Sequence, residues 1–168
     1  MIRAAVITVS DSTSAGARVD LSGPAVKERL ERLGWQVSAI HVVPDEAESI
    51  GTLLKTLADG GDVSAIFTTG GTGLAARDVT PEATRAVLDR EIPGIGEVMR
   101  AKGREATPLA VLSRAVAGTR GRVLIVNLPG SPKGAVESLG AIVNVVPHIV
   151  DLLSGRTEHH CPEPPTRP

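Results

Sequence analysis

The 168-residue sequence has almost no aromatic side chains: Trp35 and Phe67 are the only two, and tyrosine is absent. Proteins that bind single-stranded nucleic acid commonly stack the bases on aromatic side chains, so this shortage argues against that class. The formal net charge is −1 and the isoelectric point is near 6.4, so there is no excess of positive charge to attract a phosphate backbone. We therefore expect no nucleic-acid partner.

The sequence has a single cysteine, Cys161, which excludes an intrachain disulfide framework. A chain without disulfides fits a reducing compartment. No apolar run approaches the length of about 20 residues that a membrane-spanning helix needs, and the first residues do not read as a secretion signal. These features predict a cytoplasmic protein with no membrane segment.

Length and composition fit one domain over residues 1–154, followed by a proline-rich tail over 155–168 that we expect to be flexible. His159, His160 and Cys161 lie in this tail and have the composition of a metal-binding tract. Because no second cluster of ligands accompanies them at a suitable spacing, a solvated tail is the favoured interpretation.

Apolar runs alternate with amphipathic segments along the chain, an order typical of βαβ units. We expect an α/β fold, a three-layer α/β/α sandwich with a mostly parallel sheet, made mixed by a hairpin that turns at 119–122. The stripe Leu21, Ala25, Leu30 and Leu33 is expected to face inward from the first helix. Strands are predicted at about 2–9, 36–43, 63–68, 114–118 and 122–127, and helices at 22–33, 46–59, 81–89, 93–104, 132–146 and 147–154.

The most informative segment is a glycine-rich turn after a predicted buried strand over 63–67. The turn reads Thr69-Gly70-Gly71-Thr72-Gly73. Its three glycines remove side chains that would block an approaching anion, although a tight connection explains them about as well. The pattern matches neither the dinucleotide fingerprint nor the Walker phosphate loop. Asp78 follows, and Thr80 with Pro81 predicts a helix in which threonine is the N-cap and proline takes the first helical position.

Two further strand ends carry polar loops. Ser10 and Asp11 follow the first strand, and Ser131 in the late loop predicts an N-cap for a helix that begins at Pro132. The free N–H groups of that helix, beside Lys133, would form an anion site. Each loop alone is explained as a capped turn. Because parallel strands end at one edge of a sheet, the loops together predict a shared ligand pocket.

A further carboxylate, Asp45, follows the predicted strand over 36–43, and two roles remain open for it. It is placed to cap a helix that starts at Glu46, with Glu48 completing an arrangement like a capping box. It is equally placed to act as a catalytic carboxylate at the same edge of the sheet.

Several motifs occur together in one order: Ser10-Asp11, Asp20-x-Ser22-Gly23-Pro24, Pro44-Asp45-Glu46, Thr69-Gly70-Gly71-Thr72-Gly73, Arg77-Asp78-Val79-Thr80-Pro81-Glu82 and Asn127-Leu128-Pro129-Gly130-Ser131-Pro132-Lys133. With these motifs the chain resembles the MoaB/Mog family of molybdenum-cofactor biosynthesis proteins, and it is similar also to the gephyrin G domain. The resemblance covers the chain to about Ser154. It implies a three-layer α/β/α fold, often trimeric, that binds molybdopterin and, in active members, adenylylates it with MgATP to give adenylyl-molybdopterin and pyrophosphate.

The resemblance also implies roles for individual residues. Asp45 and Asp78 match two family aspartates associated with catalysis, and Mg²⁺ is expected beside them because both substrates are anionic. Ala76 departs from the pattern, since some Mog sequences have arginine there, so one anion contact is missing. The residues implied in binding molybdopterin and ATP are Ser10, Asp11, Thr69, Gly70, Gly71, Thr72, Gly73, Arg77, Pro129, Gly130, Ser131 and Lys133.

Two other functions remain open. A molybdopterin carrier or scaffold would have the same pocket without transfer activity, although the presence of both Asp45 and Asp78 favours an enzyme. An unrelated nucleotide or sugar-phosphate enzyme is the other alternative, because a fold does not fix a function. The expected partners are the two small-molecule substrates, further copies of the chain in a homotrimer, and other proteins of the molybdenum-cofactor pathway.

Overall fold

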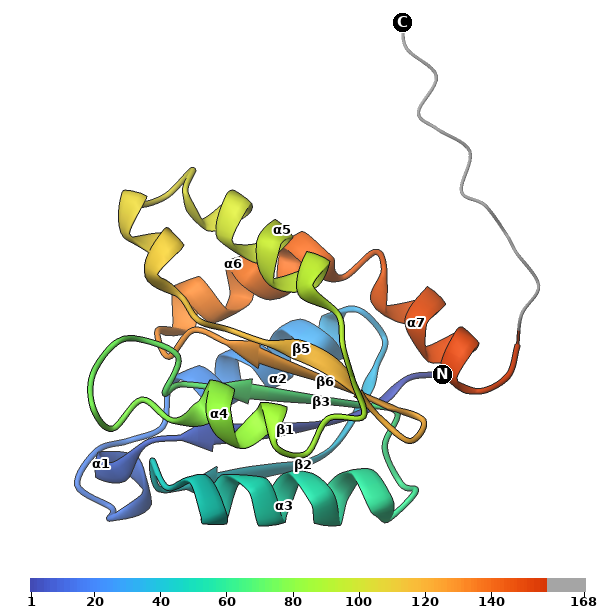
Figure 1. The fold of residues 1–168 in the computed structure, drawn as a ribbon, viewed down its shortest axis with the longest axis horizontal. Helices are drawn as coiled ribbons and strands as arrows, with labels where there is room; N and C mark the ends of the chain where they lie inside the picture. The colour runs from blue at the N-terminus through green and yellow to red at the C-terminus, as the bar shows by residue number, and fades with distance from the viewer. Residues whose placement is uncertain (157–168) are drawn as a thin grey trace, which may run out of the picture.

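The computed structural model describes residues 1–156, and Figure 1 shows the fold. The tail residues His159, His160 and Cys161, for which a solvated tail is favoured over a metal-binding tract, lie outside the described residues. The strands are β1 (Arg3–Val9), β2 (Gln36–Val43), β3 (Ala65–Thr69), β4 (Arg90–Glu91), β5 (Ala117–Arg120) and β6 (Val123–Leu128). The helices are α1 (Asp11–Ser14), α2 (Ser22–Arg32), α3 (Ala47–Asp59), α4 (Thr80–Arg85), α5 (Pro93–Gly103), the 3₁₀ helix η1 (Pro108–Leu112), α6 (Pro132–Ile142) and α7 (Val146–Leu153).

The strands form one mixed sheet in the order β2-β1-β3-β6-β5-β4. Strand β1 pairs in parallel with β2 and β3, and β3 pairs in parallel with β6. The remaining pairs, β5 with β6 and β4 with β5, are antiparallel. In the β5–β6 hairpin Arg120 lies opposite Val123, so the chain turns at residues 121–122, within the predicted turn at 119–122. The prediction of a mostly parallel, mixed sheet is confirmed.

Helices cover both faces of this sheet (Figure 1). One hydrophobic cluster joins the sheet to α2, α5, α6 and α7 through residues such as Leu30, Met99 and Leu139. A second cluster joins the opposite face to α3 and α4, with Ile50 and Leu54 of α3 fully buried. The predicted three-layer α/β/α sandwich is therefore confirmed.

Strand β1 explains why the central strands read as unbroken apolar runs. Ala4 and Val6 belong to one hydrophobic cluster, whereas Ala5 and Ile7 belong to the other. Successive side chains of a strand point to opposite faces, so a strand covered on both faces needs an apolar residue at every position. Burying a valine or isoleucine side chain fully contributes about 1.5–3 kcal/mol, which makes this strand a main source of stability.

Some predicted boundaries are wrong. The helix expected over 81–89 ends at Arg85, because the chain then turns so that the N–H of Asp89 donates to the carbonyl of Thr119 and β4 pairs with β5. The helix expected over 132–146 ends at Ile142, and the strand expected over 114–118 lies at Ala117–Arg120. The short elements α1, β4 and η1 were not predicted.

The predicted inward stripe of α2 is also only partly right. Leu30 is fully buried, but Leu21 is 60% exposed. Because α2 begins at Ser22, Leu21 precedes the helix and does not share its inward face. Val26, which the prediction omitted, takes the inward position with Leu30.

Among residues 1–156, no single helix has both the length and the apolar character needed to cross a bilayer. Helices α6 and α7 are long and apolar enough only when they are taken together, and a bend of 64° separates them. Both contribute buried residues to the core, among them Leu139 and Val146.

Candidate functional site

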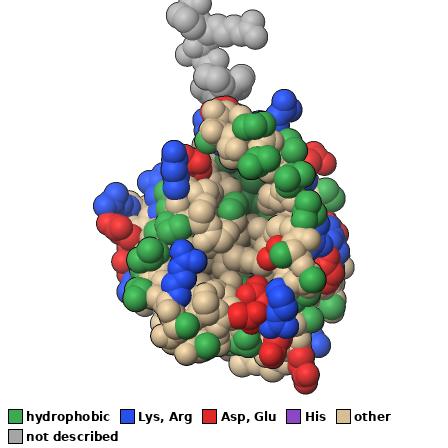
Figure 2. Space-filling model, turned by 90° about the vertical axis from the view of Figure 1, so that its left-hand side faces the viewer, with side chains coloured by type: hydrophobic (Ala, Val, Ile, Leu, Met, Phe, Trp, Pro, Cys, Tyr) green, Lys and Arg blue, Asp and Glu red, His purple; other side chains and the backbone are tan. Residues whose placement is uncertain are grey.

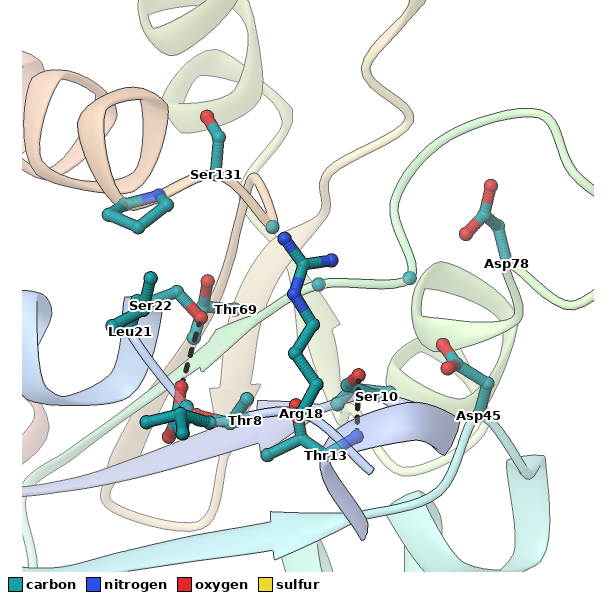
Figure 3. Close-up of a pocket in the computed structure, with 17 residues that line it drawn as sticks. Thr8, Ser10, Thr13, Arg18, Leu21, Ser22, Asp45, Thr69, Asp78 and Ser131 are labelled. Carbon is teal, nitrogen blue, oxygen red and sulfur yellow. Dashed lines mark hydrogen bonds between the residues drawn. The ribbon is translucent and has the colours of Figure 1, made fainter. Parts of the chain in front are cut away.

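The parallel strands β2, β1, β3 and β6 end at the same edge of the sheet, and the loops that follow them line a pocket of about 450 Å³. A space-filling view of this side of the molecule shows a hollow bordered by acidic and basic side chains (Figure 2). The volume is typical of a small-molecule site. The pocket is lined by Thr8, Val9, Ser10, Thr13, Arg18, Val19, Asp20, Leu21, Ser22, Asp45, Thr69, Gly70, Gly71, Asp78, Gly130, Ser131 and Pro132, which Figure 3 shows in close-up.

The glycine turn after β3 holds three strand ends together. Gly70 has a φ of 106°, which favours glycine, and its N–H donates to the carbonyl of Leu128 at 3.2 Å. A Cβ on Gly70 would lie 2.2 Å from the carbonyl oxygen of Val9. The hydroxyl of Thr69 donates to the carbonyl of Pro129 at 2.7 Å. The turn therefore needs glycine for the packing of β1, β3 and β6 against one another, whatever ligand it binds.

Thr80 does not cap α4 as predicted. The N-cap is Val79, and Thr80 is the first helical residue. The buried hydroxyl of Thr80 donates to the carbonyl of Gly70 at 2.9 Å, and its N–H donates to the carbonyl of Gly71 at 3.1 Å. Thr80 thus fixes the glycine turn against α4, a tertiary role that the local sequence pattern does not indicate.

Asp45 does not cap α3 either, because Glu46 is the N-cap and Asp45 has other partners. The N–H of Asp11 donates to Oδ2 of Asp45, and the N–H of Asp45 donates to Oδ1 of Asp11, both at 2.9 Å. This reciprocal pair ties the first residue of α1 to the loop after β2. The predicted capping-box role of Glu48 is also not observed.

Arg77 completes this cluster by binding Asp11. Its Nε and Nη2 donate to the two carboxylate oxygens of Asp11 at 2.9 and 2.8 Å. Hydrogen bonds from the Arg77 guanidinium hold the pKa of Asp11 below its ordinary value. Burial raises the pKa of Asp45, and the negative charges of Asp11 and Asp78 raise it further, against the lowering effect of the hydrogen bond from Asp11 N–H.

Asp78 enters the pocket from the loop between β3 and α4. Its Oδ2 accepts a hydrogen bond from the N–H of Ala75 at 2.8 Å, and a Cβ on Gly73 would lie 2.8 Å from the same oxygen. Arg114 holds this loop from outside the pocket, donating to the carbonyls of Gly73 at 2.7 Å and of Asp78 at 2.6 Å, and its backbone N–H donates to the carbonyl of Thr72. The backbone position of Asp78 is therefore fixed by a long-range contact.

The structure brings most of the predicted site residues to the pocket wall. Ser131 caps α6 as predicted, by accepting a hydrogen bond from the N–H of Gly134 at 3.1 Å. Lys133 points away: its side chain is 82% exposed and lies 3.8 Å from Glu137. The predicted residues that line the pocket are Ser10, Asp45, Thr69, Gly70, Gly71, Asp78, Gly130 and Ser131, and those that do not are Asp11, Thr72, Gly73, Arg77, Pro129 and Lys133.

The structure adds pocket residues that the prediction omitted. Asp20 accepts hydrogen bonds from the hydroxyl of Thr8 at 2.7 Å and from the N–H of Gly23 at 3.0 Å, and so joins β1 to the start of α2. The motif Asp20-x-Ser22-Gly23 was a signal for this part of the wall. Arg18 and Leu21 had no such signal, because they lie in an irregular loop that has no periodic pattern.

Two carboxylates in the pocket, Asp45 and Asp78, are candidates for binding a metal ion. Among residues 1–156, no cluster of three or more histidine, cysteine or acidic side chains is arranged to hold a metal by itself. Mg²⁺ commonly uses only one or two carboxylates and takes its other ligands from water and substrate phosphates. The donor set therefore fits a magnesium ion that binds together with a phosphate substrate.

The fold and the site define an α/β ligand-binding protein whose pocket combines a glycine turn, a helix N-terminus and the carboxylates of Asp45 and Asp78 at the carboxyl ends of parallel strands. Comparison with known proteins identifies the family. Residues 5–148 match the model of the "Probable molybdopterin binding domain", and the chain belongs to this family. The predicted resemblance is confirmed.

Individual relatives agree with this assignment. The chain is 42% identical over 156 residues to a molybdopterin adenylyltransferase from Helicobacter pylori, covering 92% of this chain and 89% of that protein. It is 38% identical over 168 residues to gephyrin from Dictyostelium discoideum, covering 94% of this chain and 23% of the longer protein. Among solved structures, the molybdopterin biosynthesis enzyme MoaB from Thermus thermophilus is 52% identical, with a TM-score of 0.87 over 92% of this chain and 98% of that one.

Proposed function

We propose that this protein is a molybdopterin adenylyltransferase that acts in molybdenum-cofactor biosynthesis. It transfers the adenylyl group of ATP to molybdopterin and releases pyrophosphate. The observation that supports this function most is that Asp45 and Asp78, from the loops after β2 and β3, line one pocket together with the glycine turn. The name shared by its close relatives supports the same activity.

In the proposed reaction a phosphate oxygen of molybdopterin attacks the α-phosphorus of ATP. A new P–O bond forms, the bond between the α-phosphorus and the bridging oxygen breaks, and pyrophosphate leaves with the electron pair. Proteins catalyse this kind of transfer mainly by aligning the reactants and stabilising the developing charge. Asp45 and Asp78 would hold Mg²⁺, which when bound would neutralise charge on the phosphate oxygens.

The backbone around the pocket supplies hydrogen-bond donors for these anionic groups. The amide of Gly71, which lines the pocket, donates to no other group in the part of the chain that the structure describes. The capped N-terminus of α6 lies on the same pocket, at Ser131 and Pro132. N–H groups and the positive end of a helix dipole stabilise phosphate oxygens without a further charged side chain.

The test is the formation of adenylyl-molybdopterin by purified protein with molybdopterin, ATP and Mg²⁺. We expect Asp78→Asn and Asp45→Asn each to lower turnover by at least roughly 100-fold while keeping most of the affinity for molybdopterin, because each change removes charge but keeps shape. Asp62→Asn is the matched control, since Asp62 is exposed and precedes β3 at the opposite edge of the sheet. Its turnover should equal that of the wild type.

Two results would contradict the proposal. Full turnover in both the Asp45 and Asp78 variants would remove the catalytic role of the carboxylates. Tight binding of molybdopterin by the wild type without any release of pyrophosphate would instead indicate a carrier or scaffold. The homotrimer, the contacts with other pathway proteins and the cytoplasmic location expected from the sequence stay predictions.

A further inference from the structure

The pocket has an unusual balance of charge for a site that would bind two anionic substrates. Among the described residues that line it, Asp20, Asp45 and Asp78 carry carboxylates and Arg18 carries the one positive charge. Three negative charges and one positive charge give a formal sum of −2. A magnesium ion would offset the charges of Asp45 and Asp78, but phosphate groups away from that ion need another partner.

Arg77 and Lys133, the two cationic side chains predicted to bind the anionic substrates, have partners outside the pocket. Arg77 forms a two-pronged ion pair with Asp11, so the donors on that edge of its guanidinium are already occupied. Lys133 is exposed, lies near Glu137 and is not part of the pocket wall. Neither side chain reaches the pocket in this arrangement.

Arg18 lies in the loop between α1 and α2, and unlike Arg77 and Lys133 it lines the pocket. Its backbone N–H donates to the carbonyl of Ser12 at 3.1 Å, which ties the loop to α1. Within residues 1–156 its guanidinium makes no hydrogen bond or ion pair. In the view of Figure 3 the side chain extends into the pocket, with Ser131 on one side and Asp45 and Asp78 on the other.

We propose that Arg18 binds the triphosphate of ATP and stabilises the pyrophosphate leaving group during adenylyl transfer. This inference rests on the proposed function. A guanidinium presents several N–H donors in a planar fork that spans two phosphate oxygens, and it stays protonated at all relevant pH values. When the bond to the α-phosphorus breaks, the electron pair and the negative charge move to the pyrophosphate. The guanidinium of Arg18 would stabilise that growing charge from the side of the pocket opposite Asp45 and Asp78.

The assignment explains how the pocket separates two tasks. The carboxylates of Asp45 and Asp78 repel phosphate and need a cation, whereas Arg18 attracts phosphate directly. Donors aimed at the charge that develops in a transition state raise turnover as well as affinity. Arg18 is therefore a catalytic residue that contacts the leaving group. It lies in the loop between α1 and α2, outside the glycine turn and the loop before α6 from which the sequence predicted phosphate binding.

The experiment measures binding and turnover in Arg18→Ala and Arg18→Lys, with Arg122→Ala as the matched control. Arg122 is also exposed and has no ion pair among the described residues, but it lies before β6 at the opposite edge of the sheet. Titration calorimetry with inorganic pyrophosphate and MgCl₂ should show a loss of affinity of roughly 10- to 100-fold in Arg18→Ala, as expected for a hydrogen bond to a charged group. Arg18→Lys should recover part of it, and Arg122→Ala should stay within about twofold of the wild type.

Turnover then identifies the substrate that Arg18 contacts. Arg18→Ala should raise the KM for ATP and lower kcat, with the KM for molybdopterin unchanged. An unchanged affinity for pyrophosphate, or no measurable binding of pyrophosphate by the wild type, would overturn the proposal. An increase confined to the KM for molybdopterin would overturn it too, by assigning Arg18 to the pterin phosphate.

The same data separate this inference from the proposed function. If the wild type forms no adenylyl-molybdopterin but Arg18→Ala still loses affinity for pyrophosphate, adenylyl transfer is refuted and Arg18 stands as a phosphate ligand. If the wild type is active and Arg18→Ala matches it in every measurement, the proposed function stands and the role of Arg18 is refuted.

Discussion

Gly70 shows how strongly a single backbone position is constrained at this site. Its φ of 106° is rare for any side chain, and an added Cβ would lie 2.2 Å from the carbonyl oxygen of Val9. We expect Gly70→Ala to lower the free energy of unfolding by about 3–5 kcal/mol, because backbone strain and overpacking add to each other. Urea denaturation followed by circular dichroism would measure the loss.

Gly121→Ala is the control for this prediction. Gly121 also has a positive φ, 54°, but no atom lies within 4 Å of the position of an added Cβ. Strain alone should cost about 1–2 kcal/mol there. Equal losses in the two variants would show that the close contact with Val9 contributes nothing.

Individual residue roles were predicted best where they depend on local sequence. Ser131 caps α6 as its position before Pro132 indicates. The cap predicted for Thr80 and the cap that was one of two roles left open for Asp45 are both absent, because these side chains bind groups outside their own helix. Asp45 contacts a backbone amide 34 positions earlier, and no local pattern reports such a partner.

At the scale of elements, Arg114 links the segment before β5 to the loop that carries Asp78. Its guanidinium donates to the carbonyls of Gly73 and Asp78 and pairs with Glu82. We expect Arg114→Ala to lower kcat at least roughly 10-fold with a smaller effect on the KM for ATP, because a misplaced catalytic group costs turnover more than binding. Faster hydrogen exchange at amides 72–78 should accompany the loss.

Arg120→Ala is the matched control for Arg114→Ala. Arg120 makes an equivalent bridge, to Asp59 and to the carbonyl of Val87, and its side chain is similarly covered. Both variants should lose stability, but only Arg114→Ala should lose turnover. Arg114→Lys should not restore activity, since one ammonium group cannot reach both carbonyls and Glu82. Normal kcat in Arg114→Ala would exclude a positioning role.

The longer elements were predictable because each has a period. Strands β1, β3 and β6 are buried on both faces and read as apolar runs, and α3 and α6 have clear amphipathic patterns. The elements that were missed are too short to show a period: α1 has four residues and β4 has two. Strand β4 exists because β5 offers it a partner, which is a property of the fold and not of its own sequence.

At the scale of the whole molecule, the predicted convergence of loops is present, and its reason is topological. Parallel strands bring their carboxyl ends to one edge, so polar residues after β1, β2, β3 and β6 must meet. Which side chains point inward does not follow from that rule. Lys133, in the first turn of α6, and Arg18, in the loop between α1 and α2, both lie at this edge, yet only Arg18 lines the pocket.

The dependence of stability on pH includes contributions from two carboxyl groups at opposite ends of the molecule, those of Asp11 and Asp59. Hydrogen bonds from Arg77 and Arg120 lower the pKa of Asp11 and of Asp59, respectively. A carboxyl group whose pKa is lowered by folding stabilises the protein above its unfolded pKa of about 4, and this contribution is lost as the pH falls through the folded pKa. We expect the Tm of the wild type to fall steadily below about pH 4.

Asp45 has the opposite effect on the pH dependence of stability, because burial raises its pKa. Its contribution to stability is fully present below the unfolded pKa and is lost as the pH rises through the folded pKa, so its charge destabilises the folded protein at about pH 7. Asp45→Asn removes that charge but keeps an oxygen to accept the hydrogen bond from the N–H of Asp11. The variant should therefore have a higher Tm than the wild type at about pH 7, and the difference should shrink as the pH falls towards about 3.

Asp62→Asn, at an exposed position, is the control and should show no such pH-dependent difference. Scanning calorimetry of both variants and the wild type between about pH 3 and pH 8 measures the effect. A lower Tm for Asp45→Asn at neutral pH would contradict the prediction. It would mean that the charged carboxylate holds the loops of Asp11 and Asp45 together more strongly than its burial opposes folding.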